Sequence, residues 1–336
     1  MTKIRPALAD HKPHLAHFSP WFFFSHMTHH RGSAVSTTST PSQVRYRDRQ
    51  TGEIIVERVP GQSLLRWLYG TEMGQLFFRA FLNRPLCSRL CGWWQQGMWT
   101  RRQIRSFVEH YRIDCNEFEL PLSQYRSFND FFIRRLKPQA RPCDPDPECL
   151  CSPADGKVLI YPQLKPETEL PIKNSFPTAD SLLGGAKDPA PYQGGSALVV
   201  RLAPYDYHRF HFPADGQAGE TQWIDGNYHS VNPLALKRFP YILHGNRRTV
   251  CELETLQFGK IAYIEVGALN VASIVQTYAS GPCIRGGEKG FFQFGGSTVV
   301  LLFEPDAILF DQDLVSDSAN GLEVHVRTGT GIGRRA

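Results

Sequence analysis

Short apolar and alternating runs dominate the second half of the chain. After Pro142, a proline-rich stretch over 143–149 has the composition of a linker, and glycine, proline and aspartate punctuate the remaining residues. Runs rich in Val, Ile, Leu, Phe and Tyr between such turn residues predict β-strands. We expect strands at 157–161, 196–203, 260–268, 271–278, 297–303 and 322–329. Residues 143–336 are therefore predicted to form a β-rich domain.

A helical periodicity marks the region before it. In the segment 63–82, apolar residues recur at helical spacing, namely Leu64, Leu65, Leu68, Leu76, Phe77 and Phe81. Residues 100–111, with Thr100 as N-cap, and residues 127–136 predict two further amphipathic helices. Basic, aromatic-bearing helices of this kind suit a membrane interface, and they equally suit packing against a protein core. The pattern alone leaves both interpretations open.

The N-terminal segment differs from both regions. Residues 1–43 are rich in His, Ser, Thr and Pro and hold six of the twelve histidines, a composition that favours a disordered extension over a metal-binding tail. We therefore divide the chain into a disordered extension (1–45), a helical membrane-associating region (46–142) and the β-rich domain (143–336). Helices followed by a β-rich region predict an α+β fold.

The charge distribution indicates an anionic partner for the first half. Residues 1–142 carry 21 Lys and Arg against 10 Asp and Glu, a net charge of +11, whereas residues 143–336 carry 16 against 22. Nucleic acid, an anionic membrane leaflet and a solvated surface without a partner all fit this asymmetry. No recognisable nucleic-acid motif supports the first of these, so we expect no nucleic-acid partner.

Membrane-spanning and metal-binding classes find no support in the sequence. No uninterrupted apolar run reaches the roughly 18 residues that a transmembrane helix needs. The eight cysteines show no zinc-binding spacing, and no metal is expected. Because no secretory signal peptide is visible, we expect a reducing compartment and free thiols.

One stretch, FQFGGSTVVLLF (292–303), raises a question of chemistry. Two apolar runs flank a pair of glycines followed by Ser297 and Thr298. Paired glycines between β-prone runs ordinarily form a hairpin turn. Alternatively, a serine hydroxyl can attack the carbonyl of the residue before it, and a glycine there has no side chain to shield that carbonyl.

Two further polar stretches could assist such a serine. SPADGKV (152–158) holds Asp155, and PYDYHRFHFPADG (204–216) holds His208 and His211. An acid, a histidine and a serine are the parts of a base-assisted nucleophile. Each part also has an ordinary structural interpretation, since Asp-Gly forms turns and buried histidines form hydrogen bonds. Spacing alone does not bring these segments together.

Longer stretches that occur in order along the chain narrow the choice. They are ERVPG (57–61), RWLYGTEMG (66–74), FNDFFIRRLKPQARP (128–142), SPADGKV (152–158), DYHRFHFPADG (206–216), SVNPLAL (230–236), YIEVGALNVASI (263–274) and EKGFFQFGGSTVVLLF (288–303). Together, from about residue 46 to 334, they closely resemble the pyruvoyl-dependent phosphatidylserine decarboxylase family. The Gly-Gly-Ser-Thr form is similar to one branch of it. So many motifs in one order are far more specific than any one of them.

The resemblance implies a proenzyme that cuts itself after Gly296. Ser297 would attack the Gly296 carbonyl, and His211, oriented by Asp155, would accept the serine proton. Elimination from the resulting ester, followed by hydrolysis, would give chains 1–296 and 297–336. The second chain would begin with a covalent pyruvoyl group derived from Ser297. It is expected to stay bound, because 297–303 would be a strand inside the sheet.

The resemblance also implies decarboxylation of phosphatidylserine to phosphatidylethanolamine. The substrate amine would form a Schiff base with the pyruvoyl group, which acts as the electron sink, and His208 would protonate the carbanion. The implied partners are phosphatidylserine, an anionic membrane surface and the two chains of one precursor, with a homodimer left open. The expected location is peripheral, on the cytoplasmic face of the cell membrane, with the mitochondrial inner membrane as the alternative.

Two other functions remain open from sequence. One is a pyruvoyl-dependent decarboxylase of a soluble, aromatic amino acid, and the other is a non-catalytic lipid-binding protein with a dead active site. The basic, aromatic-bearing helical region favours a lipid substrate. The presence of Asp155, both histidines and Gly296-Ser297 favours an active enzyme.

Overall fold

The computed structural model describes residues 44–59, 61–83, 93–164, 178–232, 235, 241–268, 274–293 and 297–336. The expected disordered extension (1–45) falls almost wholly outside these ranges, as does Gly296 at the expected cleavage site. No helix in the described ranges combines the length and the apolar character needed to cross a bilayer.

The predicted α+β fold is confirmed, and the strands of the described residues form one large sheet and two three-stranded sheets. They are β1 (Arg45–Asp48), β2 (Ile54–Val56), β3 (Cys149–Cys151), β4 (Gly156–Tyr161), β5 (Ser196–Leu202), β6 (Arg209–His211), β7 (Gly216–Ala218), β8 (Gln222–Ile224), β9 (Arg248–Thr255), β10 (Gly259–Val266), β11 (Ile274–Gln276), β12 (Gly281–Cys283), β13 (Glu288–Phe292), β14 (Ser297–Phe303), β15 (Ile308–Phe310), β16 (Glu323–Val326) and β17 (Gly331–Arg335).

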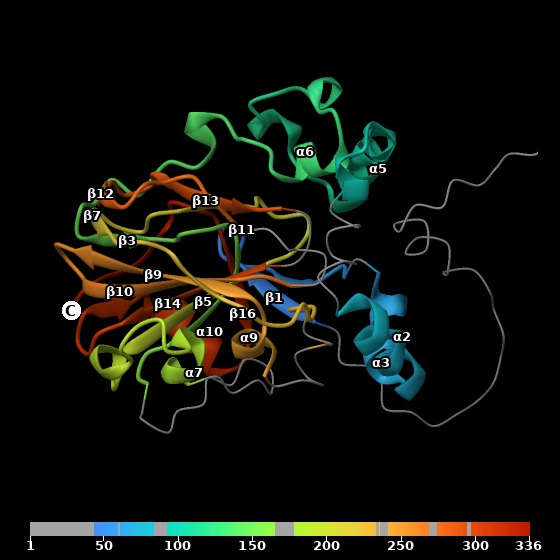
Figure 1. The fold of residues 1–336 in the computed structure, drawn as a ribbon. Helices are drawn as coiled ribbons and strands as arrows, with labels where there is room; N and C mark the ends of the chain where they lie inside the picture. The colour runs from blue at the N-terminus through green and yellow to red at the C-terminus, as the bar shows by residue number, and fades with distance from the viewer. Residues whose placement is uncertain are drawn as a thin grey trace, which may run out of the picture.

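The helices are short and lie around these strands. They are α2 (Gln62–Gly70), α3 (Glu72–Phe77), the π-helical segment η1 (Phe78–Leu82), α5 (Arg102–Tyr111), α6 (Phe128–Phe132), α7 (Ala179–Leu183), α9 (Ile242–Gly245) and α10 (Gln312–Ala319). Figure 1 shows α5 and α6 on one side of the stacked strands and α7, α9 and α10 on the opposite side, with α2 and α3 beside one end.

A large sheet organises the β-rich region. Within the described residues it runs in the order β12-β7-β9-β10-β14-β5-β4-β16-β1-β2, with β8 also paired to β9. Strand β14 lies between β10 and β5, and all seven of its residues are buried. The two faces of the sheet pack against separate apolar clusters, one including Leu301 and Phe303 and the other Val300 and Leu302. Burial on both faces explains why residues 299–303 (VVLLF) are continuously apolar.

The stretch FQFGGSTVVLLF is not a hairpin. Strand β13 pairs with β11 and β6 in a separate three-stranded sheet, whereas β14 pairs with β10 and β5. The chain therefore leaves one sheet and enters another between Phe292 and Ser297. This places Ser297 at the entry to a central strand rather than at an exposed turn.

The predicted helix over 63–82 is broken at Thr71. This residue is extended (φ −123°), and its hydroxyl accepts a hydrogen bond from Gly74 N, so it ends α2 and caps α3. The expected single apolar face is divided as a result. Leu65 and Leu68 are buried, as is Phe78 of η1, whereas the apolar side chains Met73, Leu76, Phe77 and Phe81 are exposed.

Thr100 does not cap a helix as predicted. Its hydroxyl donates to the Gly97 carbonyl and accepts from Phe128 N, and α5 begins after a preceding 3₁₀ turn, without a side-chain cap. The apolar faces of α5 and α6 pack against each other, with Phe107 and Phe128 edge to face at 5.1 Å. For these two helices, the structure supports core packing rather than a free amphipathic face.

The expected boundary at residues 142/143 does not separate the two regions. Strands β1 and β2 precede the helices in sequence but extend the large sheet, where β1 pairs in parallel with β16. Glu57, just after β2, forms a buried ion pair with Arg201 of β5 at 2.8 Å, and Arg201 also pairs with Glu323 of β16 at 2.7 Å. Residues 45–57 are thus built into the β-rich core.

Candidate active site

Ser297 is fully buried at the first position of β14, and its hydroxyl contacts a histidine. The distance from Ser297 Oγ to His208 Nδ1 is 3.3 Å. On the other side of the ring, His208 Nε2 lies 3.0 Å from the Ala203 carbonyl oxygen. A carbonyl only accepts, so Nε2 carries the proton, and Nδ1 of the neutral ring is the acceptor for the serine hydroxyl. The local geometry is that of a serine held by a base.

His208 is held rigidly in this orientation. Its ring stacks on Phe132 of α6, with centroids 3.9 Å apart, and it is completely buried. Burial lowers the pKa of His208 to about 3, and the positive charges of Arg134 and Lys157 act in the same direction. The ring is therefore neutral at physiological pH, which is the state that can accept a proton.

His211 occupies a different position. Its Nδ1 donates to the Gly286 carbonyl at 2.9 Å, which leaves Nε2 as the basic nitrogen. That Nε2 is buried and has no hydrogen-bond partner within the described residues. Burial also lowers the pKa of His211, partly offset by the Gly286 carbonyl. His211 is thus a second, half-buried histidine with a buried basic nitrogen, and it forms no hydrogen bond with Ser297 within the described residues.

Asp155 is engaged by groups other than the histidines. Arg141 donates to both of its carboxylate oxygens, with Nη2–Oδ2 at 2.6 Å, and Thr328 N donates to Oδ1 at 2.8 Å. Burial opposes ionisation of this carboxyl, but the hydrogen bonds and charge of Arg141 prevail and lower its pKa to about 2. Asp155 still acts electrostatically on both His208 and His211.

The family resemblance predicts that Asp155 orients His211 and that His211 contacts Ser297, and the structure shows other partners for these residues. The histidine in contact with Ser297 is His208, and the carboxylate of Asp155 is taken up by Arg141 and Thr328. The physical reason is the place of each residue relative to β6. His208 precedes the strand and faces the entry to β14, whereas His211 ends it and hydrogen bonds across to Gly286.

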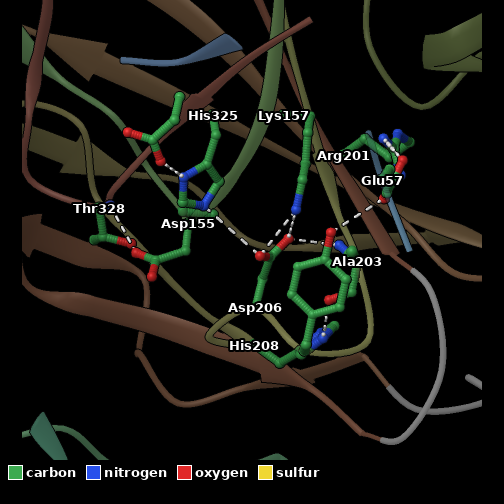
Figure 2. A network of polar contacts seen from close by, with 12 residues as sticks. Glu57, Asp155, Lys157, Arg201, Ala203, Asp206, His208, His325 and Thr328 are labelled. Atoms are coloured by element: carbon green, nitrogen blue, oxygen red, sulfur yellow. Dashed lines mark hydrogen bonds and ion pairs between the residues drawn. The ribbon is translucent and has the colours of Figure 1, made fainter. Parts of the chain in front are cut away.

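A buried charge network that the sequence patterns did not reveal lies behind His208. Lys157 of β4 pairs with Asp206 at 2.8 Å, and Asp206 also accepts from Ala203 N at 2.7 Å (Figure 2). The motifs SPADGKV and DYHRFHFPADG carry these two residues. A lysine inside the apolar run KVLIY is itself a signal, since a buried ammonium requires a partner.

The buried histidines predict a marked acid sensitivity. Burial lowers the pKa of His208 to about 3 and that of His229 to about 4, so both rings stay neutral in the folded protein at a pH where unfolded histidines, with a pKa near 6.5, take up protons. Above pH 6.5 these two histidines do not lower the free energy of unfolding. As the pH falls from 6.5 toward 4, each lowers it by about 1.4 kcal/mol per pH unit, because the unfolded chain binds a proton that the folded protein does not.

Urea unfolding of uncut precursor between pH 7.5 and 4.5 measures this effect. We expect stability to fall with pH, and we expect the His229→Phe variant, which keeps the stacking on Phe78, to show a shallower fall. An equal slope in the variant and the parent would contradict the assignment of His229.

Comparison with known proteins places the chain in a family. The model of the phosphatidylserine decarboxylase family matches residues 128–334, which include Asp155, both histidines and Ser297. The chain is 46% identical over 291 residues to the phosphatidylserine decarboxylase proenzyme of Chlamydia muridarum, covering 86% of this chain and 97% of that protein. The chain belongs to the phosphatidylserine decarboxylase family.

Further relatives agree with this membership. The phosphatidylserine decarboxylase proenzymes of Chlamydia trachomatis serovar L2 and Chlamydia caviae are each 44% identical to the chain. Those matches cover 294 and 293 residues, each 87% of this chain and 98% of the relative. The buried contact between Ser297 and His208 lies within the region that the family model matches.

Proposed function

We propose that this chain is a proenzyme that cuts itself between Gly296 and Ser297 and then decarboxylates phosphatidylserine to phosphatidylethanolamine. Family membership supports the reaction, and the contact of Ser297 Oγ with His208 Nδ1 at 3.3 Å supports the site. We propose Asp155, His208, His211 and Ser297 as the site residues, with Gly296 on the acyl side of the cleaved bond.

In the self-cleavage, Ser297 supplies the nucleophile and His208 accepts its proton. A bond forms between Ser297 Oγ and the Gly296 carbonyl carbon, the Gly296–Ser297 peptide bond breaks, and the released nitrogen takes the proton. A base removes the Ser297 Cα proton as the Gly296 carboxylate leaves Cβ, which gives a dehydroalanine, and addition of water with release of ammonia then converts it to a pyruvoyl group. The glycine leaves the attacked carbonyl without a side chain to shield it.

The residues around position 297 fit a pyruvoyl group. The position is fully buried, the basic Nδ1 of His208 faces it, and Arg134 and Lys157 lower the pKa of that ring. Once formed, the group would supply an electrophilic carbonyl for the substrate amine and a sink for the electron pair that stays behind when carbon dioxide leaves. His208 would hold and return the proton at this position, and burial would exclude competing water.

The segment 297–336 is proposed to remain bound after cleavage. Strand β14 pairs with β10 and β5, and β16 pairs with β4 and β1. Ion pairs join the same segment to the rest of the chain, including Arg47–Asp317 at 2.6 Å and the buried Arg201–Glu323 pair at 2.7 Å. Separation of the two chains would expose a central strand and leave Arg201 with fewer partners.

An exposed apolar surface on α2, α3 and η1 supports a membrane-bound location. Its members, which we call the α2–η1 surface, are Trp67, Met73, Leu76, Phe77 and Phe81, and Met73 is 69% exposed. Arg66 and Arg79 are exposed on the same helices. Large exposed apolar groups beside cations suit insertion into an anionic lipid interface.

The α2–η1 surface is attached at the end of the sheet where Ser297 lies. The side chain of Asn83, after η1, donates to Asn227, whose backbone hydrogen bonds to Gly245 and Arg247. Arg248 then starts β9 opposite Val266, and Val266 lies opposite Thr298, next to Ser297. A lipid-docked α2–η1 surface would hold this end of the sheet toward the bilayer. We propose a peripheral membrane location on this basis.

Vesicle co-sedimentation tests the proposed surface. The double variant Leu76→Asp/Phe81→Asp should bind vesicles containing phosphatidylserine at least about tenfold more weakly, since burying such side chains is worth roughly 1.5–3 kcal/mol each. The control Leu256→Asp changes an apolar residue that is 83% exposed after β9, at the opposite end of the strands. Equal loss in both variants, or none in either, would contradict the proposed surface.

A substrate assay separates the proposed function from its soluble alternative. Processed protein should release carbon dioxide from phosphatidylserine in vesicles, and much less from free aromatic amino acids. Turnover of the amino acids alone would overturn the lipid assignment.

A further inference from the structure

We infer that Cys143 and Cys151 form a peroxide-reactive thiol pair, in which Cys143 reacts first and Cys151 then closes a disulfide with it. The pair lies beside Gly286, whose carbonyl accepts a hydrogen bond from His211, and its oxidation is expected to slow the enzyme reversibly. Only this effect on activity rests on the proposed function. The modification itself rests on the geometry of the two thiols.

The two thiols are in contact before any bond joins them. Cys143 and Cys151 are both free cysteines, and their thiol groups hydrogen bond to each other. The backbone beside each residue is bound to the same glycine. Asp144 N donates to the Gly329 carbonyl at 2.9 Å, and Gly329 N donates to the Ser152 carbonyl at 3.0 Å. The segment around Gly329 therefore holds the two cysteines side by side.

Two glycines allow this close approach. Gly331 of β17 lies opposite Cys151 of β3. Gly329 has a φ of +83°, and a Cβ atom there would lie 2.5 Å from the Pro142 carbonyl oxygen and 3.3 Å from Cys143 Cα. A side chain at position 329 would be strained and would push residues 142–143 away from β3.

The two thiols differ in exposure and in acidity. Cys143 is partly exposed, whereas Cys151 is 1% exposed. The hydrogen bond from Cys151 lowers the pKa of Cys143, and the positive charge of Arg285 acts in the same direction. Burial and the nearby carboxylates of Asp215 and Asp144 oppose this shift without cancelling it. The same hydrogen bond, together with burial, raises the pKa of Cys151.

A partly exposed thiolate beside a second thiol is the usual arrangement of redox-reactive cysteines. The Cys143 sulfur attacks one oxygen of hydrogen peroxide or an organic peroxide, the O–O bond breaks, and the other oxygen leaves with a proton as water or an alcohol. Cys143 is thereby oxidised to a sulfenic acid. The Cys151 sulfur then displaces the hydroxyl group as water, and the S–S bond forms. The two thiols lose two electrons and two protons, and the peroxide is reduced.

The thiol pair is linked to His211 through one residue. A Cβ atom on Gly286 would overlap Cys143 Sγ, so the sulfur packs directly against this glycine. Gly286 N donates to the Phe212 carbonyl at 2.8 Å, and the Gly286 carbonyl accepts from His211 Nδ1 at 2.9 Å. Formation of the S–S bond draws the Cys143 sulfur closer to Cys151 than a hydrogen bond holds it. Its packing against Gly286 must then change.

Peptide mass after oxidation tests the modification. Reduced, folded protein is treated with hydrogen peroxide, denatured and alkylated, and its tryptic peptides are weighed. In the Cys149→Ser background, the peptide that contains 142–157 holds only Cys143 and Cys151. We expect this peptide to lose the mass of two hydrogen atoms and to escape alkylation, and a reductant to reverse both changes.

Two variants and an internal control identify the order of reaction. With Cys151→Ser, Cys143 should stop at the sulfenic acid, which a 1,3-dione traps, and Cys143→Ser should give neither product. Cys115 is exposed, but its thiol faces the Ile113 carbonyl at 3.8 Å and burial raises its pKa. It should react at least about tenfold more slowly than Cys143. If Cys151→Ser does not fold, Cys143→Ser at the more exposed position still tests the pair.

The decarboxylase assay tests the link to His211. Oxidised Cys149→Ser protein should release carbon dioxide from phosphatidylserine about tenfold more slowly than reduced protein, because small displacements near a site residue are costly. A reductant should restore the rate, and peroxide should not slow the Cys143→Ser variant in this reversible way.

Two results would overturn the inference. If peroxide gives no disulfide between Cys143 and Cys151 while Cys115 is oxidised, the two cysteines are not a reactive pair. If the disulfide forms without changing the decarboxylation rate, the link to His211 is wrong. If the reduced protein releases no carbon dioxide from phosphatidylserine, the proposed function fails, while the peptide masses still decide whether the thiol pair reacts.

Discussion

The Ser297→Ala variant is expected to remain a single chain of 336 residues and to have no decarboxylase activity. Alanine lacks the oxygen that would attack the Gly296 carbonyl, so neither the break nor the pyruvoyl group can form. Removing a nucleophile of this kind costs at least about 10⁴-fold, and here the group that carries the decarboxylation is lost with it. Denaturing electrophoresis over time and an assay for carbon dioxide release measure the two effects.

A matched control guards against loss through misfolding. Ser196 is a buried serine at the start of β5, the strand beside β14, at the far end from Ser297. Ser196→Ala should cleave and turn over normally. Cleavage of Ser297→Ala at the wild-type rate would rule out the proposed nucleophile.

The second large effect separates the two histidines. Because His208 Nδ1 is the nitrogen in contact with Ser297 Oγ, His208→Ala should slow self-cleavage by about 10² to 10⁴-fold, the usual contribution of a positioned base. His211→Ala should slow it by less than about tenfold, since its Nδ1 is bound to Gly286 and its ring does not contact the serine. Following both precursors by denaturing electrophoresis gives the two rates.

The opposite outcome would restore the pairing expected from the family resemblance. If His211→Ala stayed uncut while His208→Ala cleaved, the chain would have to rearrange so that the free Nε2 of His211 reaches Ser297. His208 would then keep only the proposed role of returning a proton during decarboxylation. The two variants therefore decide between two specific assignments.

The central strands of the β-rich region could be predicted from sequence because they are buried on both faces. The runs that became β5 and β14 contain the apolar stretches 197–200 and 299–303, which are typical of strands buried on both faces. The partners of these strands could not be predicted. Nothing within FQFGGSTVVLLF distinguishes a hairpin from a crossing between two sheets, because that choice depends on the distant strands β5, β10 and β11.

The helical region was predicted less well for a related reason. The apolar spacing continues across Thr71, so the pattern gives no sign that the helix breaks there. Whether an apolar side chain is buried or faces solvent depends on what packs above it. The sequence pattern placed Leu68 and Phe81 on one face, yet Leu68 is buried under the β-rich region and Phe81 is exposed.

The proposed site residues came from the family resemblance, and their contacts could not be predicted from sequence. The Gly286 and Ala203 carbonyls that orient the two histidines are backbone atoms, which leave no mark in a sequence. Arg141, which donates hydrogen bonds to the Asp155 carboxylate, lies outside the β-rich domain that the sequence predicted for 143–336. Lys157 was the available signal, since a lysine in an apolar strand implies a buried carboxylate.

The intact mass of freshly purified protein under denaturing conditions tests the central claim most directly. We predict two chains, residues 1–296 and 297–336. The smaller chain should be lighter than the same peptide with an N-terminal serine by the difference between serine and pyruvoyl, and it should resist Edman sequencing. A single full-length chain in a preparation that decarboxylates phosphatidylserine would contradict the account.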